Sequence, residues 1–383
     1  MKINIAVVGK FHVFNYAPYL IDSSVLNKFY YSHKKKTAEL LGGENNFVNF
    51  PLKEYLSQIH GRLFGDFLYE KMMLLYLRSW EKSVIKSWSN CDVLHVLCQG
   101  AAVRVIDKAK KNGTKVLCEV VNTNPLNRFN VLKAESDYWG LNLNKKEVFK
   151  RELQIIEEVS MADAILSPSD AVSNSYKKYS SVEKTIYKIP YAVNAKRFEN
   201  FFSYRNNNKI IKILSVGEIG LRKGQLRFLD IVKKNNFICD ITLVGVINPV
   251  IKNLLLKYAE SFTHIERVPS QEMPLLMAAH DIYVAPSFEE GLALSVAEAM
   301  AAGLAVIASK ESGAGEIIIN GVDGLLYDAG NDQQLSTALA LFIDNNDYMK
   351  NIGFNAKKKS SDFLTWSNYA TELIKVYKKL SAS

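Results

Sequence analysis

The sequence predicts an α/β protein made of two doubly wound, parallel-sheet domains. Short apolar runs typical of buried strands alternate with longer amphipathic segments along the chain, and this alternation is typical of parallel sheets with crossover helices. The chain has 383 residues, of which 48% are hydrophobic. That length and composition are enough to give each of two medium-sized domains its own core.

The expected strands form two series. In the first half of the chain they cover 3–8, 92–97, 115–121, 164–166 and 185–189. A polar stretch, FENFFSYRNNNK, then separates the halves, and the second series covers 210–216, 240–244, 264–268, 282–285 and 306–308. In doubly wound sheets a ligand crevice lies at the carboxyl ends of the strands, so motifs that directly follow strands carry the most weight.

Charge is distributed unevenly along the chain. Residues 1–200 hold 29 Lys and Arg against 20 Asp and Glu, a net charge of +9, whereas residues 201–383 hold 19 of each. A basic half indicates either an anionic partner, such as an acidic glycan or a membrane surface, or an ordinary solvated surface. Nucleic acid is not expected, because the basic residues are scattered and no binding motif accompanies them.

The amino-terminal residues show no targeting pattern, and no uninterrupted apolar run is long enough to span a bilayer, so a cytoplasmic location is expected. The segment 64–88, FGDFLYEKMMLLYLRSWEKSVIKSW, is apolar on more than one side and carries interspersed basic residues. It predicts either a core helix of the first domain or a basic helix at the membrane interface. The four cysteines show neither metal-ligand nor disulfide spacing, which favours a packing role.

The segment SFEEGLALSVAEAMAAGLAVIAS, at 287–309, is the most informative part of the chain. It follows the expected strand 282–285 and predicts a loop, a helix and another strand. Ser295 and Glu298 have the spacing of a capping box, so the helix is expected to start at Ser295. Free N–H groups at a helix N-terminus attract phosphate. Taken singly, Glu298 could be only a cap and Glu290 only a solvated carboxylate.

A second loop, VGEIGLRKG at 216–224, follows the first strand of the second series. Arg222 and Lys223 lie on it, just ahead of an expected helix. Two cations in this position can hold a diphosphate and neutralise the charge that develops on it as it leaves, without a metal. The chain has no Asp-x-Asp motif, and no metal ligand is predicted. The alternative is an ordinary exposed loop.

These motifs resemble the donor-binding segment of family 4 of the retaining glycosyltransferases, whose form is "PS..EGFG...EAMA.G.PVIAS...G..E.I..G..G". The stretch GKFHVFNYAPYL at 9–20 is similar to the "GKFH.F.LA..L" opening of a bacterial polysaccharide-type subgroup, and the likeness extends along nearly the entire chain. The resemblance implies the GT-B fold, in which two Rossmann-like domains face a cleft. Residues 1–199 would bind the acceptor, 208–364 the donor, and a helix at about 365–383 would pack back on the first domain.

The resemblance also implies roles for individual residues. Those that it places at the chemistry are Glu290, Lys223, Arg222 and His12, with the imidazole of His12 facing the cleft. Those that it places around the donor are Gly9, Gly217, Arg222, Lys223, Val268, Glu290, Gly291, Leu292, Ala293 and Glu298. Within this set Glu290 would lie near the sugar hydroxyls, the N–H groups of Leu292 and Ala293 at the phosphate, and Glu298 on the ribose.

Three positions depart from the pattern of the family. Glu218 replaces an arginine of the "VGR....KG" form, and Ala293 replaces a glycine, so its methyl group narrows the approach to phosphate. Asn124 stands where relatives often have the histidine of "NTHP". Asparagine can hydrogen-bond a hydroxyl but cannot shuttle a proton, so a role as general base is not expected.

The function implied is a retaining, metal-independent transfer of a sugar from a nucleoside diphosphate of UDP or GDP type. The acceptor would be a glycan or lipid-linked saccharide in cell-surface polysaccharide biosynthesis. No cofactor is expected, and the protein would contact the anionic cytoplasmic face of the membrane peripherally if at all. Two alternatives stay open: a sugar phosphorylase or epimerase on the same fold, and a nucleotide-sugar-binding subunit without catalysis.

Overall fold

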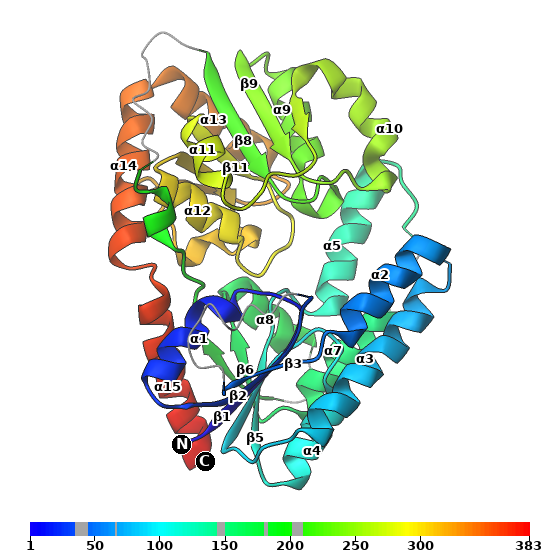
Figure 1. The fold of residues 1–383 in the computed structure, drawn as a ribbon. Helices are drawn as coiled ribbons and strands as arrows, with labels where there is room; N and C mark the ends of the chain where they lie inside the picture. Colours follow the sequence, from blue (N-terminus) through cyan, green and yellow to red (C-terminus); the bar gives the residue numbers. More distant parts are fainter. Residues whose placement is uncertain (35–44, 66, 144–149, 180–182, 201–209) are drawn as a thin grey trace.

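The computed structural model describes residues 1–34, 45–65, 67–143, 150–179, 183–200 and 210–383. Two α/β domains lie one above the other, and both chain ends lie at the base of the first domain (Figure 1). The first domain contains a seven-stranded parallel sheet in the order β3-β2-β1-β4-β5-β6-β7. Its strands are β1 (Ile3–Val8), β2 (Leu26–Ser32), β3 (Phe47–Asn49), β4 (Val93–Leu97), β5 (Lys115–Glu119), β6 (Ala164–Ser167) and β7 (Thr185–Lys188).

Helices cover both faces of this sheet (Figure 1). They are α1 (Val13–Asp22), α2 (Leu52–Phe64), α3 (Tyr69–Lys86), α4 (Val103–Lys111), α5 (Pro125–Tyr138), α7 (Lys150–Met161) and α8 (Asp170–Tyr179). The inner strands are buried, including every residue of β1, β4 and β6, whereas the edge strands β3 and β7 are partly exposed. A sheet covered on both faces requires such apolar strands rather than an alternating pattern.

The second domain contains a six-stranded parallel sheet in the order β10-β9-β8-β11-β12-β13. Its strands are β8 (Ile211–Val216), β9 (Cys239–Val244), β10 (Thr263–Ile265), β11 (Ile282–Ala285), β12 (Ala305–Ser309) and β13 (Leu325–Tyr327). Its helices are α9 (Gln225–Lys234), α10 (Lys252–Leu255), α11 (Met273–Ala278), α12 (Leu294–Ala302), α13 (Asp332–Asp344) and α14 (Asn346–Asp362). The strand order reverses between β8 and β11, where doubly wound domains bind ligands.

The predicted fold class is confirmed by the two parallel sheets. Strands β2, β3 and β13 were not predicted. In β2 the polar residues Asn27 and Lys28 interrupt the apolar run, and β3 and β13 have only three residues each, too few for a periodic signal. Most of the polar stretch expected between the domains, 201–209, lies outside the described residues.

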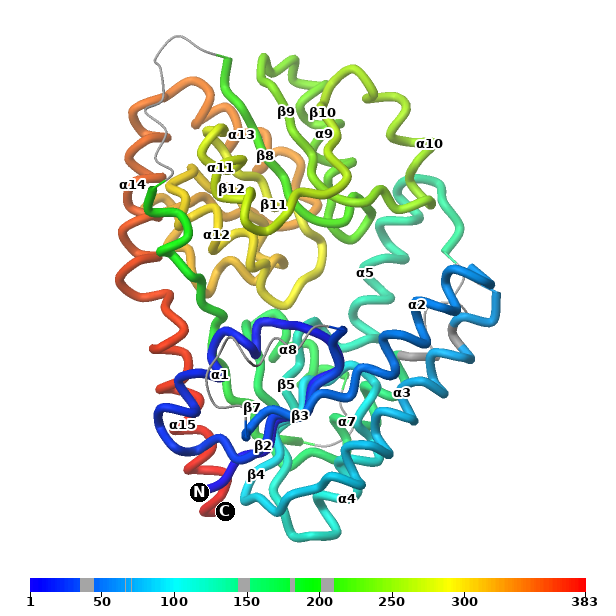
Figure 2. Tube along the Cα trace, in the orientation of Figure 1, coloured from blue at the N-terminus to red at the C-terminus, as the bar shows by residue number. Residues whose placement is uncertain are grey.

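The chain returns to the first domain through its last helix. Helix α14 runs along the second domain and leads into α15 (Trp366–Ala382), which packs against α1 of the first domain (Figure 2). Trp366, Tyr369 and Tyr377 of α15 are buried in the same hydrophobic core as α1. This crossing connects the two domains a second time, in addition to the chain that links them after β7.

Glu119, at the end of β5, is the centre of a buried polar cluster that holds α15. Its carboxylate is 1% exposed, and the imidazole nitrogens His12 Nε2 and His95 Nε2 lie 2.6 and 3.1 Å from its two oxygens. Tyr369 donates its hydroxyl to Glu119 Oε1 at 3.5 Å, and the Tyr377 hydroxyl lies 2.6 Å from His95 Nδ1. The last helix is therefore held by hydrogen bonds as well as by apolar packing.

Most of the segment expected as one helix over 64–88 is helix α3, and only Phe64, the last residue of α2, belongs to the helix before it. Helix α2 ends before its C-cap, Gly65, where φ is +55°, and α3 begins at Tyr69. Trp80 and Leu77 of α3 are 2% and 3% exposed, so α3 is a core helix of the first domain. None of the helices over the described residues combines the length and the apolar character that crossing a bilayer requires.

Candidate functional site

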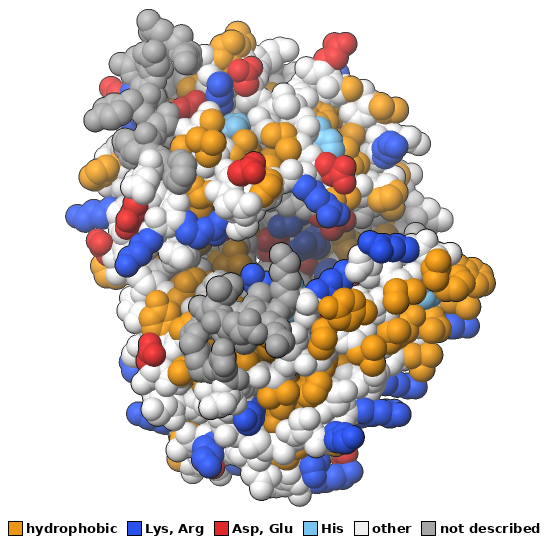
Figure 3. Space-filling view, viewed as in Figure 1, with side chains coloured by type: hydrophobic (Ala, Val, Ile, Leu, Met, Phe, Trp, Pro, Cys, Tyr) orange, Lys and Arg blue, Asp and Glu red, His pale blue; other side chains and the backbone are white. Residues whose placement is uncertain are grey.

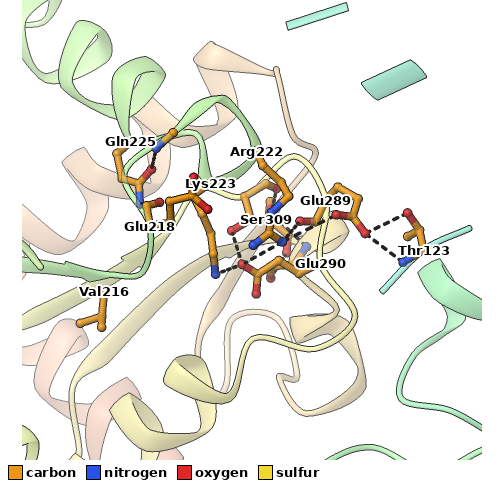
Figure 4. A network of polar contacts seen from close by, with 12 residues as sticks. Thr123, Val216, Glu218, Arg222, Lys223, Gln225, Glu289, Glu290 and Ser309 are labelled. Atoms are coloured by element: carbon orange, nitrogen blue, oxygen red, sulfur yellow. Dashed lines mark hydrogen bonds and ion pairs between the residues drawn. The ribbon is translucent and has the colours of Figure 1, made fainter. Parts of the chain in front are cut away.

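The acidic loop and the basic loop of the second domain meet at the reversal of strand order. Glu290, on the loop between β11 and α12, is in contact with Lys223 Nζ and accepts a hydrogen bond from Ser287 Oγ at 3.3 Å. Arg222 Nη1 lies 3.8 Å from Glu290 Oε1 and donates to the Glu289 carbonyl oxygen at 3.0 Å. Figure 4 shows these side chains converging. The structure thus brings together three of the four residues predicted for the chemistry.

The side chain of Lys223 is 16% exposed and lies beside the backbone of Gly217. A Cβ atom at Gly217, where φ is +141°, would lie 3.1 Å from Lys223 Cε, so glycine leaves the space that the lysine stem occupies. Burial, and then the neighbouring charge of Arg222, lower the pKa of Lys223 to about 7. A bound polyanion would offset the second of these effects, because it would place negative charge between the two cations.

Glu289, which sequence reasoning missed, connects the two domains. Its Oε1 accepts hydrogen bonds from the Thr123 backbone N–H at 2.9 Å and from Thr123 Oγ1 at 2.8 Å. Its Oε2 is buried without a hydrogen-bond partner and lies 3.6 Å from Arg222 Nη1. The family motif includes its neighbour Glu290 and gives Glu289 no role. No pattern in the sequence around Glu289 indicates that its side chain contacts Thr123, 166 positions earlier.

Arg227 makes a second contact between the domains. Arg227 of α9 pairs with Glu135 of α5 through Nε to Oε1 at 3.2 Å and Nη2 to Oε2 at 3.3 Å. Its guanidinium also lies 3.4 Å from the centre of the Tyr138 ring. Bidentate pairing and stacking both suit the planar arginine side chain. Together with Glu289, this residue holds the domains in contact.

Replacing Gly291 with alanine is expected to disfavour this contact while leaving each domain folded. A Cβ atom there would lie closer than 3.0 Å to the carbonyl oxygen of Val121, which belongs to the other domain. Overpacking of this kind costs about 1–3 kcal/mol. Only the arrangement with the domains in contact has this cost, so its population should fall roughly 5- to 150-fold. Small-angle scattering should report a larger radius of gyration.

Gly315→Ala is the matched control for that variant, because the nearest atom to its Cβ is 4.0 Å away. The control should leave the scattering curve unchanged. An unchanged curve for Gly291→Ala as well would mean that the domains can meet without this close approach.

Helix α12 begins differently from the prediction. The helix starts at Leu294, its N-cap is Ala293, and no side chain caps it, so the expected capping box of Ser295 and Glu298 is wrong. Glu298 instead accepts a hydrogen bond from Arg197 Nη1 at 3.2 Å. The N–H of Ala293, expected at the phosphate, donates to the Ser312 carbonyl oxygen at 3.0 Å. Glu298 and the Ala293 N–H are thus each paired with a residue outside α12, Arg197 and Ser312, in place of the contacts that were expected.

His12 does not lie with Lys223 and Glu290. Its imidazole is 4% exposed and is held by Glu119 in the cluster that anchors α15, rather than facing an open cleft as expected. Gly9, three residues earlier, has φ at +103°, and a Cβ atom there would lie 3.0 Å from the ring of Phe11. Val268 lies beyond β10 and packs against the edge of the hydrophobic core that contains α12.

Two of the departures from the family pattern have structural partners. Glu218 Oε1 accepts a hydrogen bond from Asn248 Nδ2 at 2.7 Å, so its carboxylate faces the β9 loop. Asn124 is the N-cap of α5, and its Oδ1 accepts from the Leu126 N–H at 3.0 Å. Asparagine is among the best N-cap residues. Asn124 therefore caps the start of α5.

A cavity of about 270 Å³ opens between the domains beside the two cations. Arg128 and Glu152 line it from the first domain, and Glu218, Arg222 and Lys223 from the second. Glu152 is in contact with Arg128 Nη2 through Oε1, while its Oε2 is buried without a hydrogen-bond partner.

A larger groove of about 800 Å³ lies at the amino-terminal edge of the second sheet, around Lys212, Thr242 and His280. It contains none of the residues predicted from the sequence. Over the part of the chain that the structure describes, no group of three or more His, Cys, Asp or Glu side chains is arranged to hold a metal ion.

Comparison with known proteins agrees with this arrangement. Residues 196–359 match the family described as glycosyl transferases group 1. An uncharacterized glycosyltransferase of Methanocaldococcus jannaschii is 32% identical over 171 residues, which cover 44% of this chain and 48% of that relative. The chain thus matches about half of the length of this curated relative.

Solved structures match over almost the full chain. Sucrose-phosphate synthase from Thermosynechococcus elongatus superposes with a TM-score of 0.70 at 15% identity, covering 99% of both chains. The Anabaena protein HepE in complex with UDP-glucose superposes with a TM-score of 0.67 at 15% identity, covering 99% of this chain and 100% of that one. The whole chain has the GT-B fold, and its residues 196–359, which include most of the second domain, match the family of glycosyl transferases group 1.

Proposed function

We propose that the protein is a retaining glycosyltransferase that moves a sugar from a nucleoside diphosphate to a glycan or lipid-linked saccharide in cell-surface polysaccharide biosynthesis. The observation that carries the proposal is the convergence of Lys223, Arg222 and Glu290 where the strand order reverses. The family match of the same domain, and the UDP-glucose bound by the similar Anabaena protein, support a donor of the UDP type.

In this proposal the basic loop performs the charge chemistry. Lys223 and Arg222 neutralise the diphosphate as the bond to the sugar breaks, and no metal is needed because both charges come from the protein. Glu290 exchanges its contact with Lys223 for hydroxyl groups of the donor sugar. The acceptor hydroxyl enters from the face that the diphosphate leaves and passes its proton to the phosphate. Contact between the domains excludes water, which would otherwise hydrolyse the donor.

The acceptor is proposed to enter the interdomain cavity beside Arg222. Residues of both domains line this cavity, Arg128 and Glu152 from the first and Arg222 and Lys223 from the second, so an acceptor there would lie next to the two cations. His12 is proposed to act by holding α15 and not by touching substrate, because its imidazole is engaged by Glu119. The protein is proposed to work in the cytoplasm, in peripheral contact with the anionic membrane face.

The donor is tested by thermal unfolding with UDP, GDP, ADP and CMP and with their common sugar conjugates, with and without a divalent metal. A ligand at about 100 times its dissociation constant adds about 2.7 kcal/mol, which raises Tm by roughly 5 °C or more. We expect one nucleoside diphosphate to do so without metal. If none shifts Tm, the donor site is not functional and the proposal fails.

The two alternatives make different predictions. A phosphorylase on this fold would need inorganic phosphate for turnover, whereas the proposed transferase would not. A binding subunit without catalysis would bind the nucleotide but show no turnover of its own, and Glu290→Gln would then leave the activity of a purified partner unchanged.

A further inference from the structure

Helix α2 exposes an apolar stripe to solvent. Leu52, Tyr55, Ile59 and Leu63 recur at spacings of three and four residues, so they lie along one face of the helix. Their exposed fractions are 55%, 47%, 52% and 69%. The other face of α2 packs against α3, where His60 is buried. Packing within the first domain therefore does not account for the outer stripe.

The turn between α2 and α3 continues the stripe. Phe64, Phe67 and Leu68 are 57%, 69% and 48% exposed. His60 Nε2 lies 2.8 Å from the Phe67 carbonyl oxygen, so the turn is anchored to α2. Leu68 adopts a left-handed backbone with φ at +52°, a conformation that is costly for leucine and is usually retained where it serves a function.

Basic side chains surround this stripe, and two acidic side chains of α2 and α3, Glu54 and Glu81, are engaged by other parts of the first domain. Figure 3 shows the hydrophobic side chains gathered over α2 and its turn, with Lys and Arg side chains around them. Arg62, Lys71 and Arg78 are exposed. By contrast, Glu54 accepts a hydrogen bond from Ser32 Oγ at 3.0 Å, and Glu81 accepts one from the Arg104 N–H at 2.8 Å.

We propose that the α2 surface, formed by the exposed apolar side chains of α2 together with Phe67 and Leu68, docks on an anionic lipid membrane. Apolar side chains enter the boundary between headgroups and acyl chains, while long basic side chains remain at the level of the anionic headgroups. The excess positive charge of the whole chain lies in this half, +9 over 1–200 against 0 over 201–383, and adds long-range attraction.

A second copy of the chain is a poorer occupant of the same surface. A twofold interface brings the same patch of both copies together, so the basic edge of one copy would face the basic edge of the other. The inference deepens the proposed function, since it names the surface that would bring the enzyme to a lipid-linked acceptor. Vesicle binding is measured without donor or acceptor, so it can fail while donor binding succeeds.

The experiment is co-sedimentation of the full chain with vesicles of pure phosphatidylcholine and of phosphatidylcholine with phosphatidylglycerol. The test variant replaces Ile59, Leu63 and Phe67 with glutamine. Each of these side chains contributes the burial of a large apolar group, so the partition coefficient on anionic vesicles should fall at least about 100-fold. Arg62→Gln should lower it about fivefold on anionic vesicles alone.

The matched control replaces Leu256, Phe354 and Phe363 with glutamine. These side chains are 69%, 62% and 68% exposed and lie in the second domain and at its end. The control should partition like the unmodified protein, and circular dichroism and Tm should show both triple variants folded. Equal partitioning of both triple variants would overturn the proposal. A loss of self-association in the test variant, with vesicle binding unchanged, would also overturn it and assign the surface to contact between copies.

Discussion

Lys223→Ala is expected to lower kcat of sugar transfer by about 100- to 1000-fold, the effect of removing one preorganised group that stabilises developing charge. Lys223 is buried beside Arg222 and in contact with Glu290, so water cannot replace the lost ammonium group as easily as at the surface. The measurement is nucleotide release from the donor found by thermal shift, in the presence of acceptor.

The loss should appear in kcat more than in KM if Lys223 acts mainly on the leaving diphosphate. Lys234→Ala is the control, because Lys234 is an exposed lysine at the far end of α9, where it pairs with Asp230 of the same helix. It should retain full activity. A Lys223→Ala enzyme within about threefold of the unmodified rate would remove this residue from the chemistry.

Glu119→Gln is expected to destabilise the protein by about 3–5 kcal/mol, the usual effect of removing one partner from a buried ionic cluster. The carboxylate is the common partner of His12, His95 and Tyr369, which come from three separate elements. The neutral amide cannot accept all of these contacts, because one of its two terminal atoms is a donor. Thermal unfolding should show a fall in Tm of several degrees.

Hydrogen exchange should show where the stability is lost. Amides of α15 and of α1 should exchange faster in Glu119→Gln, while those of the second sheet should not change. Glu372→Gln is the control on the same helix: its exposed ion pair with Lys375 has both side chains more than half exposed, and such pairs contribute about 0–1 kcal/mol. Equal effects of the two variants would show that the buried cluster does not hold the last helix.

The pH dependence of stability provides a further readout of the same residue. Burial alone would raise the pKa of Glu119, but the charge and hydrogen bond of His12, with those of His95, outweigh burial and hold the pKa well below its usual range. A carboxyl group whose pKa is depressed in the folded protein stabilises the fold at pH values above its unfolded-state pKa, about 4.5. This stabilisation is lost as the pH falls below that value. The fall in Tm between about pH 5 and pH 3 should be smaller in Glu119→Gln.

The sequence alone was sufficient to predict the parallel sheets and the loops that carry the site. Strands such as β1 and β11 are short, continuous apolar runs, and that pattern is local. Lys223 and Glu290 could be named because each lies on a loop that follows a strand and matches the pattern of the family that the chain resembles, and the strand ends of one parallel sheet meet at one edge. Their contact is thus a consequence of local pattern and topology together.

Only the tertiary structure decided which polar groups find one another across the fold. Glu289 reaches Thr123 over 166 positions and His12 reaches Glu119 over 107, and no local pattern specifies either pair. The same reason explains the cap that Glu298 does not form, because Arg197 offers it a charged partner from outside the helix. It also explains why Trp80 is buried while Leu63 is exposed. Hydrophobic periodicity marks a face of a helix, but packing against the rest of the chain determines whether that face is covered.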